Sequence, residues 1–467
     1  MLSQSGFLNK IFCIDWLSKL QWLWLLVAAP IALQMVFITP PFQVPDEPYH
    51  FYRALQVGDG VLLPATPGWQ INKSAVEIVQ FPGFTKLIHQ PDKKIDSIEE
   101  KANHISEKKW SRDTVYVSFV NSALYPPVGY FITAAALRLS QAADLTVLHS
   151  FYMARLANCL IALALCFFAI KITHRGKMVM AIILLMPTTL FEFASLSQDA
   201  LLVSAEVLAI GLFSRILDQK TIVAEGVTPI IMWVLFTIAF LCKPPYMLFV
   251  AGIVILGFIS GKTNNKTFLT GAILSVVAVL GWLLAIRDLM HVPLLLDTNI
   301  NSAQQSSLVL HDPAKFLMIA VNNFFSRGKY NLMTFVGVLG WQDTLLPPLV
   351  YIGSFLLLAI TFFAGAHEFL KRAYACQQIC AVIVPSLLTI LLISLILYVT
   401  YTPVGADVID GLQGRYYIPI ALFLCLIVDD LKPLNPVMNT LYVYGIFIAF
   451  AVFDLSAVSC LVNRYYS

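Results

Sequence analysis

Residues 40–53 read Pro-Pro-Phe-Gln-Val-Pro-Asp-Glu-Pro-Tyr-His-Phe-Tyr-Arg and follow directly after a long apolar run. The first three prolines of this stretch cannot continue an α-helix, because proline has no amide hydrogen and its ring clashes with the preceding turn. We therefore expect the chain to leave the membrane here. A new helix is expected to begin at Asp46 or Glu47, with Pro48 in its first turn, where a missing amide hydrogen costs nothing.

Three side chains of this expected helix share one face. Asp46, His50 and Arg53 follow the i, i+4, i+7 spacing, and the helix is expected to end at Gly58-Asp59-Gly60. Two interpretations remain open for the two adjacent acids, Asp46 and Glu47. They form an ordinary helix cap with a solvated face, or they bring an acid, an imidazole and a guanidinium together at a membrane exit.

The composition indicates an all-α polytopic membrane protein. Of the 467 residues, 58% are hydrophobic and 12% are charged, and the mean hydropathy is +0.77. A soluble protein carries roughly 25% charged residues. Apolar runs of this length must cross the bilayer as helices, because lipid offers no partner for unpaired backbone groups. The net charge of +3 is too small to imply a nucleic-acid partner.

The apolar runs predict about eleven spans in one transmembrane domain, residues 20–467, preceded by a cytoplasmic lead-in over residues 1–19. The expected spans are 20–38, 148–171, 179–195, 200–216, 227–242, 246–260, 267–286, 346–364, 379–400, 415–429 and 437–457. Two long external loops separate them, at residues 39–145 and 287–347. The second loop has helical apolar spacing at Pro313–Phe325, which predicts a surface helix.

The stretch Pro127–Ser140 decides the orientation of the chain. It has fewer apolar residues than the ~20 that a span needs. If it lies along the membrane surface, the basic loops at Lys171–Lys177, Gly261–Lys266 and His367–Arg372 all fall on the cytoplasmic side, as the positive-inside rule requires. We therefore expect an interfacial helix here, a cytoplasmic N-terminus and an external C-terminus.

Further polar residues fall at external ends of the expected spans. Asp199 begins the fourth span and is either a helix cap or a second functional acid. Lys243, in the turn that continues to Tyr246, either reaches the lipid headgroups or holds a phosphate oxygen. Tyr125, before Pro126-Pro127, is either a rigid entry to the surface helix or a contact for a sugar ring.

Arg415, followed by Tyr416, stands at the mouth of the tenth span. An arginine is costly there unless it is paired, so it is a candidate site residue by default. Its planar fork suits a phosphate, and Asp407, Asp410 or Asp199 are the alternative partners in a structural pair. The tripeptide Trp341-Gln342-Asp343 is a weaker candidate, for which interfacial anchoring is the favoured interpretation.

These motifs resemble those of the GT-C superfamily of membrane glycosyltransferases, and most closely a bacterial branch with the pattern Pro-Pro-x-Gln-x-Pro-Asp-Glu-Pro-x-His-x-x-Arg. The Tyr-Pro-Pro block at Tyr125 and the Gly-Arg-Tyr-Tyr block at Arg415 resemble that branch as well. In the superfamily an acidic residue follows the first span and a second acid occupies a turn like that of Asp199. The resemblance covers most of the chain, through short blocks at the ends of spans.

The resemblance implies a sugar transfer from a polyprenyl-phosphate donor, of the undecaprenyl-phosphate type, to a cell-envelope glycan or lipid such as lipopolysaccharide O-antigen. The expected place is the periplasmic face of the bacterial inner membrane. Asp46, or else Glu47, would act as the base of an inverting displacement. The residues expected to bind the donor or its lipid phosphate are His50, Arg53, Tyr125, Asp199, Lys243, Tyr246, Arg415 and Tyr416.

The sequence contains no P-loop, no G-x-G-x-x-G dinucleotide fingerprint, no H-E-x-x-H and no G-x-S-x-G. That fits a lipid-linked rather than a nucleotide-linked donor. Some members of the superfamily need a divalent metal, but this sequence offers no dedicated ligand set. Two other functions stay open: a transporter or flippase that binds lipid-linked sugars without chemistry, and a glycan polymerase.

Overall fold

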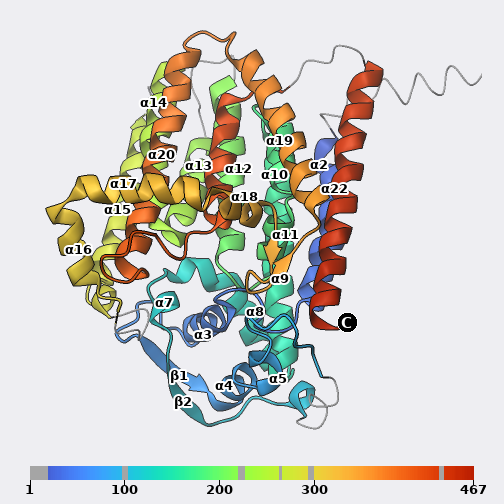
Figure 1. The fold of residues 1–467 in the computed structure, drawn as a ribbon, viewed down its shortest axis with the longest axis vertical. Helices are drawn as coiled ribbons and strands as arrows, with labels where there is room; N and C mark the ends of the chain where they lie inside the picture. Colours follow the sequence, from blue (N-terminus) through green and yellow to red (C-terminus); the bar gives the residue numbers. More distant parts are fainter. Residues whose placement is uncertain (1–18, 97–103, 219–226, 262–265, 293–298, 431–435) are drawn as a thin grey trace, which may run out of the picture.

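A bundle of long helices carries a compact cap at one end (Figure 1). The computed structural model describes residues 19–96, 104–218, 227–261, 266–292, 299–430 and 436–467. The lead-in expected over residues 1–19 therefore lies outside the described residues, apart from Lys19. The first helix, α2 (Leu20–Ile38), and the last, α22 (Pro436–Tyr465), lie side by side and both run toward the cap.

Within the described residues, seven helices are long and apolar enough to cross a membrane. They are α2, α9 (Val147–Ile172), α12 (Asp199–Asp218), α15 (Lys266–Ala285), α19 (Pro348–Phe369), α20 (Ala375–Thr400) and residues 440–465 of α22. Helix α12 is the central one, because 83% of its most apolar window is buried, against 22% for α15 and for α19. The protein is thus all-α, apart from two small two-stranded sheets.

The other four expected spans are short or broken, so the count of eleven is not confirmed. They correspond to α10 (Lys177–Ile183) with α11 (Pro187–Phe193), α13 (Thr228–Cys242), η4 (Pro244–Leu248) with α14 (Phe249–Ile259), and η6 (Gly414–Tyr417), α21 (Ile418–Phe423) and η7 (Leu424–Ile427). The break between α10 and α11 has a clear cause. Pro187 disfavours a helical residue before it, and Met186 is accordingly extended, with ψ of 134°.

The described residues of the segment 39–145 form the cap. Its elements are α3 (Glu47–Gly58), β1 (Gly68–Asn72), α4 (Lys73–Val79), α5 (Pro82–Thr85), η2 (Ile105–Glu107), β2 (Thr114–Ser118), α7 (Val120–Ala123), η3 (Pro127–Tyr130) and α8 (Phe131–Ala142). Strands β1 and β2 pair antiparallel, from Gly68 opposite Ser118 to Asn72 opposite Thr114. The cap has its own core, in which Phe42, Phe51 and Phe151 pack together. The helix expected after Asp46 is confirmed as α3.

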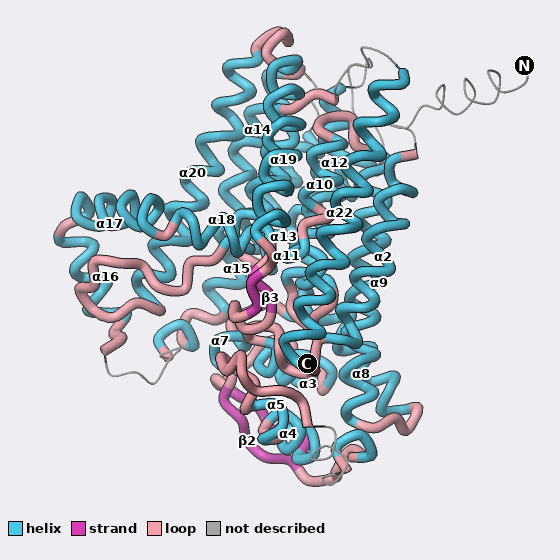
Figure 2. The backbone as a smooth tube through the Cα atoms, turned by 45° about the vertical axis from the view of Figure 1, so that its right-hand side comes forward, coloured by secondary structure: helices cyan, strands magenta, loops and turns pink. Residues whose placement is uncertain are grey.

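The second polar segment folds against the side of the bundle. It contains η5 (Leu289–His291), α16 (Ser302–His311), α17 (Pro313–Ser326), α18 (Gly328–Val336), β3 (Val338–Leu339) and β4 (Thr344–Leu345). The helix predicted over Pro313–Phe325 is confirmed as α17. It lies across the direction of the long helices, as Figures 1 and 2 both show. The loop between β3 and β4 reaches the junction of bundle and cap, where the site described next is found.

Candidate functional site

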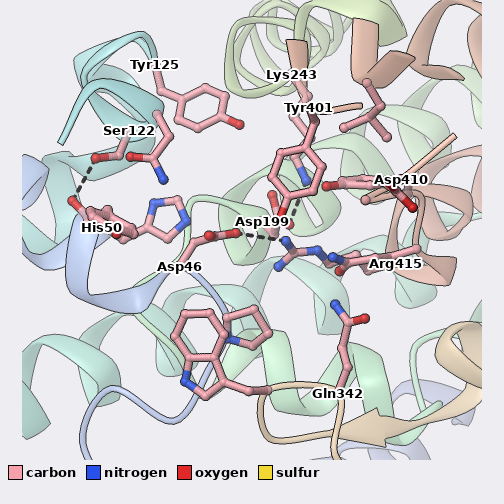
Figure 3. A pocket seen from close by; sticks show the side chains of 18 of the residues that line it. Asp46, His50, Ser122, Tyr125, Asp199, Lys243, Gln342, Tyr401, Asp410 and Arg415 are labelled. Carbon is pink, nitrogen blue, oxygen red and sulfur yellow. Dashed lines mark hydrogen bonds and ion pairs between the residues drawn. The ribbon is translucent and has the colours of Figure 1, made fainter. Parts of the chain in front are cut away.

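A cavity of about 580 Å³ lies where the cap meets the bundle (Figure 3). Its walls come from the start of α3, the segment around α7, the start of α12, the turn after α13, the β3–β4 loop and η6. Seven of the ten residues expected from the sequence line it: Asp46, His50, Tyr125, Asp199, Lys243, Arg415 and Tyr416. The other three, Glu47, Arg53 and Tyr246, are not among the described residues that line it.

Asp46 presents its carboxylate to this cavity. It occupies the N-cap position of α3, yet its side chain makes no capping hydrogen bond to the described backbone. Its backbone is left-handed, with φ of 65°, a conformation that aspartate tolerates better than most residues. Its side chain is 43% exposed. The expected position as a cap is therefore right, but the carboxylate is left available for another purpose.

Arg415 reaches Asp46 across the cavity. Its Nη2 donates to Asp46 Oδ2 at 3.1 Å, and its Nη1 lies 3.5 Å from Glu192 Oε1. Its side chain is 9% exposed, so the guanidinium is largely desolvated. The structural partners suggested by the sequence, Asp407, Asp410 and Asp199, do not form these ion pairs; Asp410 pairs with Arg327 instead.

Lys243 and Asp199 form a second ion pair in the same wall. The Lys243 Nζ atom lies 2.7 Å from Asp199 Oδ2. It also lies 4.7 Å from the centre of the Tyr416 ring, and the guanidinium carbon of Arg415 lies 5.5 Å from that centre. Two cations thus share one aromatic ring, an arrangement that stabilises both positive charges. Asp199 Oδ1 has no hydrogen-bond partner in the described part of the chain.

Two aromatic side chains on the cap side of the cavity, His50 and Tyr125, are uncharged. His50 Nδ1 is hydrogen-bonded to the Tyr130 hydroxyl at 2.7 Å. Burial lowers the pKa of His50 to about 4, so the imidazole is uncharged near neutral pH. The ring of Tyr125 lies stacked 6.3 Å from that of His50, and burial raises the pKa of its hydroxyl. This wall offers ring faces and neutral hydrogen-bonding groups, whereas the opposite wall offers ions.

Glu47 is used for a different purpose from its neighbour Asp46. Its carboxylate receives two bonds from Arg155 of α9, Nε to Oε1 at 2.8 Å and Nη2 to Oε2 at 2.5 Å. Both side chains are fully buried. The remaining acceptor positions of Glu47 take the amides of Phe42 and Leu196, at 3.1 and 3.2 Å. Such a saturated, buried pair holds structure and leaves no free lone pair for chemistry.

Arg155 also closes the end of the first helix. It donates to the carbonyl oxygens of Val36, Thr39 and Pro40, at 3.1, 2.6 and 3.1 Å. Val36 lies in the last turn of α2, whose carbonyls lack intrahelical partners, and Thr39 and Pro40 directly follow the helix. Sequence reasoning missed Arg155, although an arginine inside the apolar run 148–171 was a usable signal.

Arg53 and Tyr246 stabilise the frame around the cavity. Arg53 donates from Nε and Nη2 to the Tyr125 carbonyl, at 3.3 and 3.1 Å, and further to the carbonyls of Val61 and Leu62. The Tyr246 hydroxyl donates to the Tyr416 carbonyl at 2.9 Å. The shared face expected for Asp46, His50 and Arg53 therefore holds only for the first two.

A comparison with protein families identifies the family of the chain. The model of a family described as a predicted membrane protein, DUF2142, matches residues 31–424. The chain belongs to this DUF2142 family. It is a multi-pass membrane protein. No curated protein and no solved structure matches the chain.

The match to DUF2142 covers the whole cavity, since its lining residues run from Pro45 to Tyr416. Several of them were missed or underrated from the sequence. Gln198 is buried and neither atom of its amide has a partner among the described residues. Trp341 and Gln342, which the sequence favoured as interfacial anchors, line the cavity, and Trp341 Nε1 donates to the Phe42 carbonyl at 2.9 Å.

Glu192 is the most informative residue that the sequence analysis overlooked. It lies in α11, is 4% exposed and approaches Nη1 of Arg415, whereas Asp46 pairs with Nη2. A charge inside the apolar run 179–195 was the signal that marks such residues. Among the described residues, no three His, Cys, Asp or Glu side chains gather as a metal site.

Proposed function

We propose that this DUF2142 protein is a membrane glycosyltransferase of the GT-C type. It would move a sugar from a polyprenyl-phosphate donor to a cell-envelope glycan or lipid, such as lipopolysaccharide O-antigen. The observation that carries the proposal is the position of Asp46. A carboxylate without a capping bond faces a 580 Å³ cavity, directly opposite two cations at the ends of apolar helices.

Asp46 is the base of the proposed reaction. It takes the proton of the acceptor hydroxyl as that oxygen attacks the anomeric carbon. The bond between this carbon and the phosphate oxygen breaks, the electron pair leaves with the lipid phosphate, and the configuration is inverted. A positioned base is worth typically about 10²- to 10⁴-fold in rate. Glu47 is a poor alternative, because Arg155 and two backbone amides occupy its oxygens.

Arg415 and Lys243 are the groups that stabilise the leaving phosphate. Fixed positive charges aimed at the place where negative charge develops are usually the largest electrostatic contribution to catalysis. Arg415 supplies a planar fork that fits two phosphate oxygens, and Lys243 supplies a point charge. Lys243 follows the last residue of α13, and Arg415 lies in η6, just before α21. The phosphate of a membrane-embedded lipid would arrive at such helix ends.

His50 and Tyr125 suit the sugar. Carbohydrate rings pack on aromatic faces, and their hydroxyls bond to neutral donors and acceptors. The Tyr125 ring and the uncharged His50 imidazole offer both. The donor would thus lie with its sugar toward the cap and its phosphate toward η6. The acceptor hydroxyl, with Asp46 as its base, would approach the anomeric carbon from the side opposite the phosphate.

The proposed orientation puts the cap on the periplasmic side of the bacterial inner membrane, with a cytoplasmic N-terminus. The seven long helices and the four shorter apolar segments would then make eleven crossings. Support comes from the basic residues at the end of the bundle away from the cap, among them Arg175, Lys177, Lys371 and Arg372.

One observation favours a transporter of lipid-linked sugars as the second candidate. Helices α10 and α11 form a broken pair, and the second half carries Glu192 to the site. Broken helices at a charged site are common in transporters. A single assay separates the two functions. Purified protein with a polyprenyl-phosphate sugar and an acceptor releases free polyprenyl phosphate if it is a transferase, whereas a transporter leaves the donor intact.

The test of the proposed chemistry compares wild type with Asp46→Asn. The amide cannot accept a proton, so release of polyprenyl phosphate should fall by at least two orders of magnitude. Glu107→Gln serves as the matched control, because Glu107 is an exposed acid of the cap that does not line the cavity. This variant should retain full activity. Equal turnover by wild type and Asp46→Asn would exclude Asp46 as the base.

A further inference from the structure

A second cavity lies at the opposite end of α13 from the catalytic candidate. It is an apolar groove of about 580 Å³ between α13 and α15, lined from Ile230 to Ile238 on one helix and from Lys266 to Leu274 on the other. Its volume falls within the range of about 300–1,000 Å³ that is usual for small-molecule sites. Lys243, by contrast, follows the last residue of α13, so the two cavities are separate.

Close packing of the two helices forms the floor of the groove. A Cβ atom at Gly271 would lie 2.3 Å from the indole of Trp233, so only glycine lets α15 approach that ring. Farther along both helices, the hydroxyls of Thr237 and Ser275 bond to each other at 2.7 Å. The indole Nε1 of Trp233, a residue 3% exposed, has no hydrogen-bond partner among the described residues.

The groove changes from polar to apolar along its length. Lys266 is the first residue of α15, and Thr267 and Thr270 line the same end. The positive charge of Lys266 makes this end complementary to an anion. Beyond it the exposed apolar side chains Val234 and Leu274 are 52% and 60% accessible.

We propose that this groove binds one anionic phospholipid. The phosphate would lie against Lys266 and the start of α15, and one acyl chain would follow Val234 and Leu274. The inference follows from the positive charge of Lys266 at one end of the groove and from the exposed apolar side chains along the rest of it. It does not depend on the proposed glycosyl transfer.

Two variants and two matched controls test the site by native mass spectrometry. The intact protein is reconstituted with phosphatidylglycerol, extracted in detergent, and the bound lipids are counted. Thr270→Phe fills the groove, and Leu269→Phe places the same ring on the neighbouring position, which is 47% exposed and outside the groove. Lys266→Gln removes the cation, and Lys371→Gln removes an exposed lysine elsewhere. Melting temperatures identify any variant that fails to fold.

We expect one phosphatidylglycerol to remain on wild type and on both controls, and its apparent affinity to fall at least tenfold in Thr270→Phe and in Lys266→Gln. Phosphatidylcholine should bind more weakly than phosphatidylglycerol, and inorganic phosphate at millimolar concentration should not displace the lipid. Retention of the lipid by folded Thr270→Phe would overturn the proposal. So would a change of oligomeric state in that variant without loss of lipid, which would make the groove a helix–helix interface.

Discussion

Arg415 Nη2 and Asp46 Oδ2 lie 3.1 Å apart, although 369 residues separate them in the chain. The proposed chemistry gives these two groups opposite tasks, since one holds a phosphate and the other accepts a proton. Because Arg415 is paired with Asp46, a donor phosphate would compete with Asp46 for the guanidinium. Donor binding would therefore release the base, while Glu192, 3.5 Å from Nη1, would still pair with Arg415.

This competition predicts an ordered reaction. Because the Asp46 carboxylate is freed only when a phosphate occupies Arg415, the donor should bind before the acceptor. Initial-rate measurements with varied donor and acceptor, combined with product inhibition by polyprenyl phosphate, report the order. Productive acceptor binding in the absence of donor would contradict the prediction.

Arg415→Lys keeps the charge but loses the fork. Under the proposed function, donor affinity should fall at least tenfold while the melting temperature changes little, because Lys still pairs with Asp46 or Glu192. Arg415→Ala removes both the charge and the fork. It should lower the melting temperature as well as the donor affinity, because it leaves the largely buried Glu192 without its cation. Isothermal titration with a polyprenyl-phosphate sugar and thermal unfolding measure the two effects. Unchanged donor affinity in folded Arg415→Ala would remove Arg415 from the site.

The Glu47–Arg155 pair predicts a loss of stability rather than a loss of chemistry. Glu47→Gln leaves the fully buried guanidinium of Arg155 without its counter-charge, and breaking such a pair costs about 3–5 kcal/mol. Thermal unfolding in a defined detergent should show the loss, and turnover per folded molecule should remain near that of wild type. A stable Glu47→Gln protein without activity would instead assign the base to Glu47.

His50 gives the fold a dependence on acid pH. Burial lowers its pKa from 6.5 to about 4, so the folded state resists protonation more than the unfolded state does. The corresponding stability is complete above pH 6.5 and is lost as the pH falls from 6.5 toward 4, by about 3 kcal/mol in all. His50→Gln should flatten the fall in melting temperature between pH 6.5 and 4. His149→Gln, at an exposed histidine, is the control and should leave the curve unchanged.

The sequence predicted the helix after Asp46 and seven of the residues that line the cavity because both depend on local signals. Prolines end α2 and start α3, and polar residues at the ends of apolar runs converge wherever those ends share one side of a membrane. The different uses of Asp46 and Glu47 could not be predicted in this way. They depend on Arg155, which is 108 residues from Glu47 and inside another helix.

The count of eleven spans is not confirmed for a similar reason. Hydropathy adds apolar residues without regard to a break, so residues 179–195 were predicted as one helix although Pro187 divides them into α10 and α11. Glu192 lies in the same apolar run of sequence, and the sequence analysis overlooked it. Its partner Arg415 is 223 residues away, and only the tertiary fold brings them together.

Arg155 bonds to both the end of α2 and the start of α3, and these contacts constrain the order in which the protein folds during synthesis. During synthesis, the carbonyl groups at the end of α2 have no partner at first, and neither has the Glu47 carboxylate that will later be buried. Their partner, Arg155, is translated 108 residues after Glu47. At bacterial or eukaryotic elongation rates this interval lasts roughly 5–20 s. The contacts that join the cap to the end of α2 through Arg155 therefore cannot form until α9 has been made.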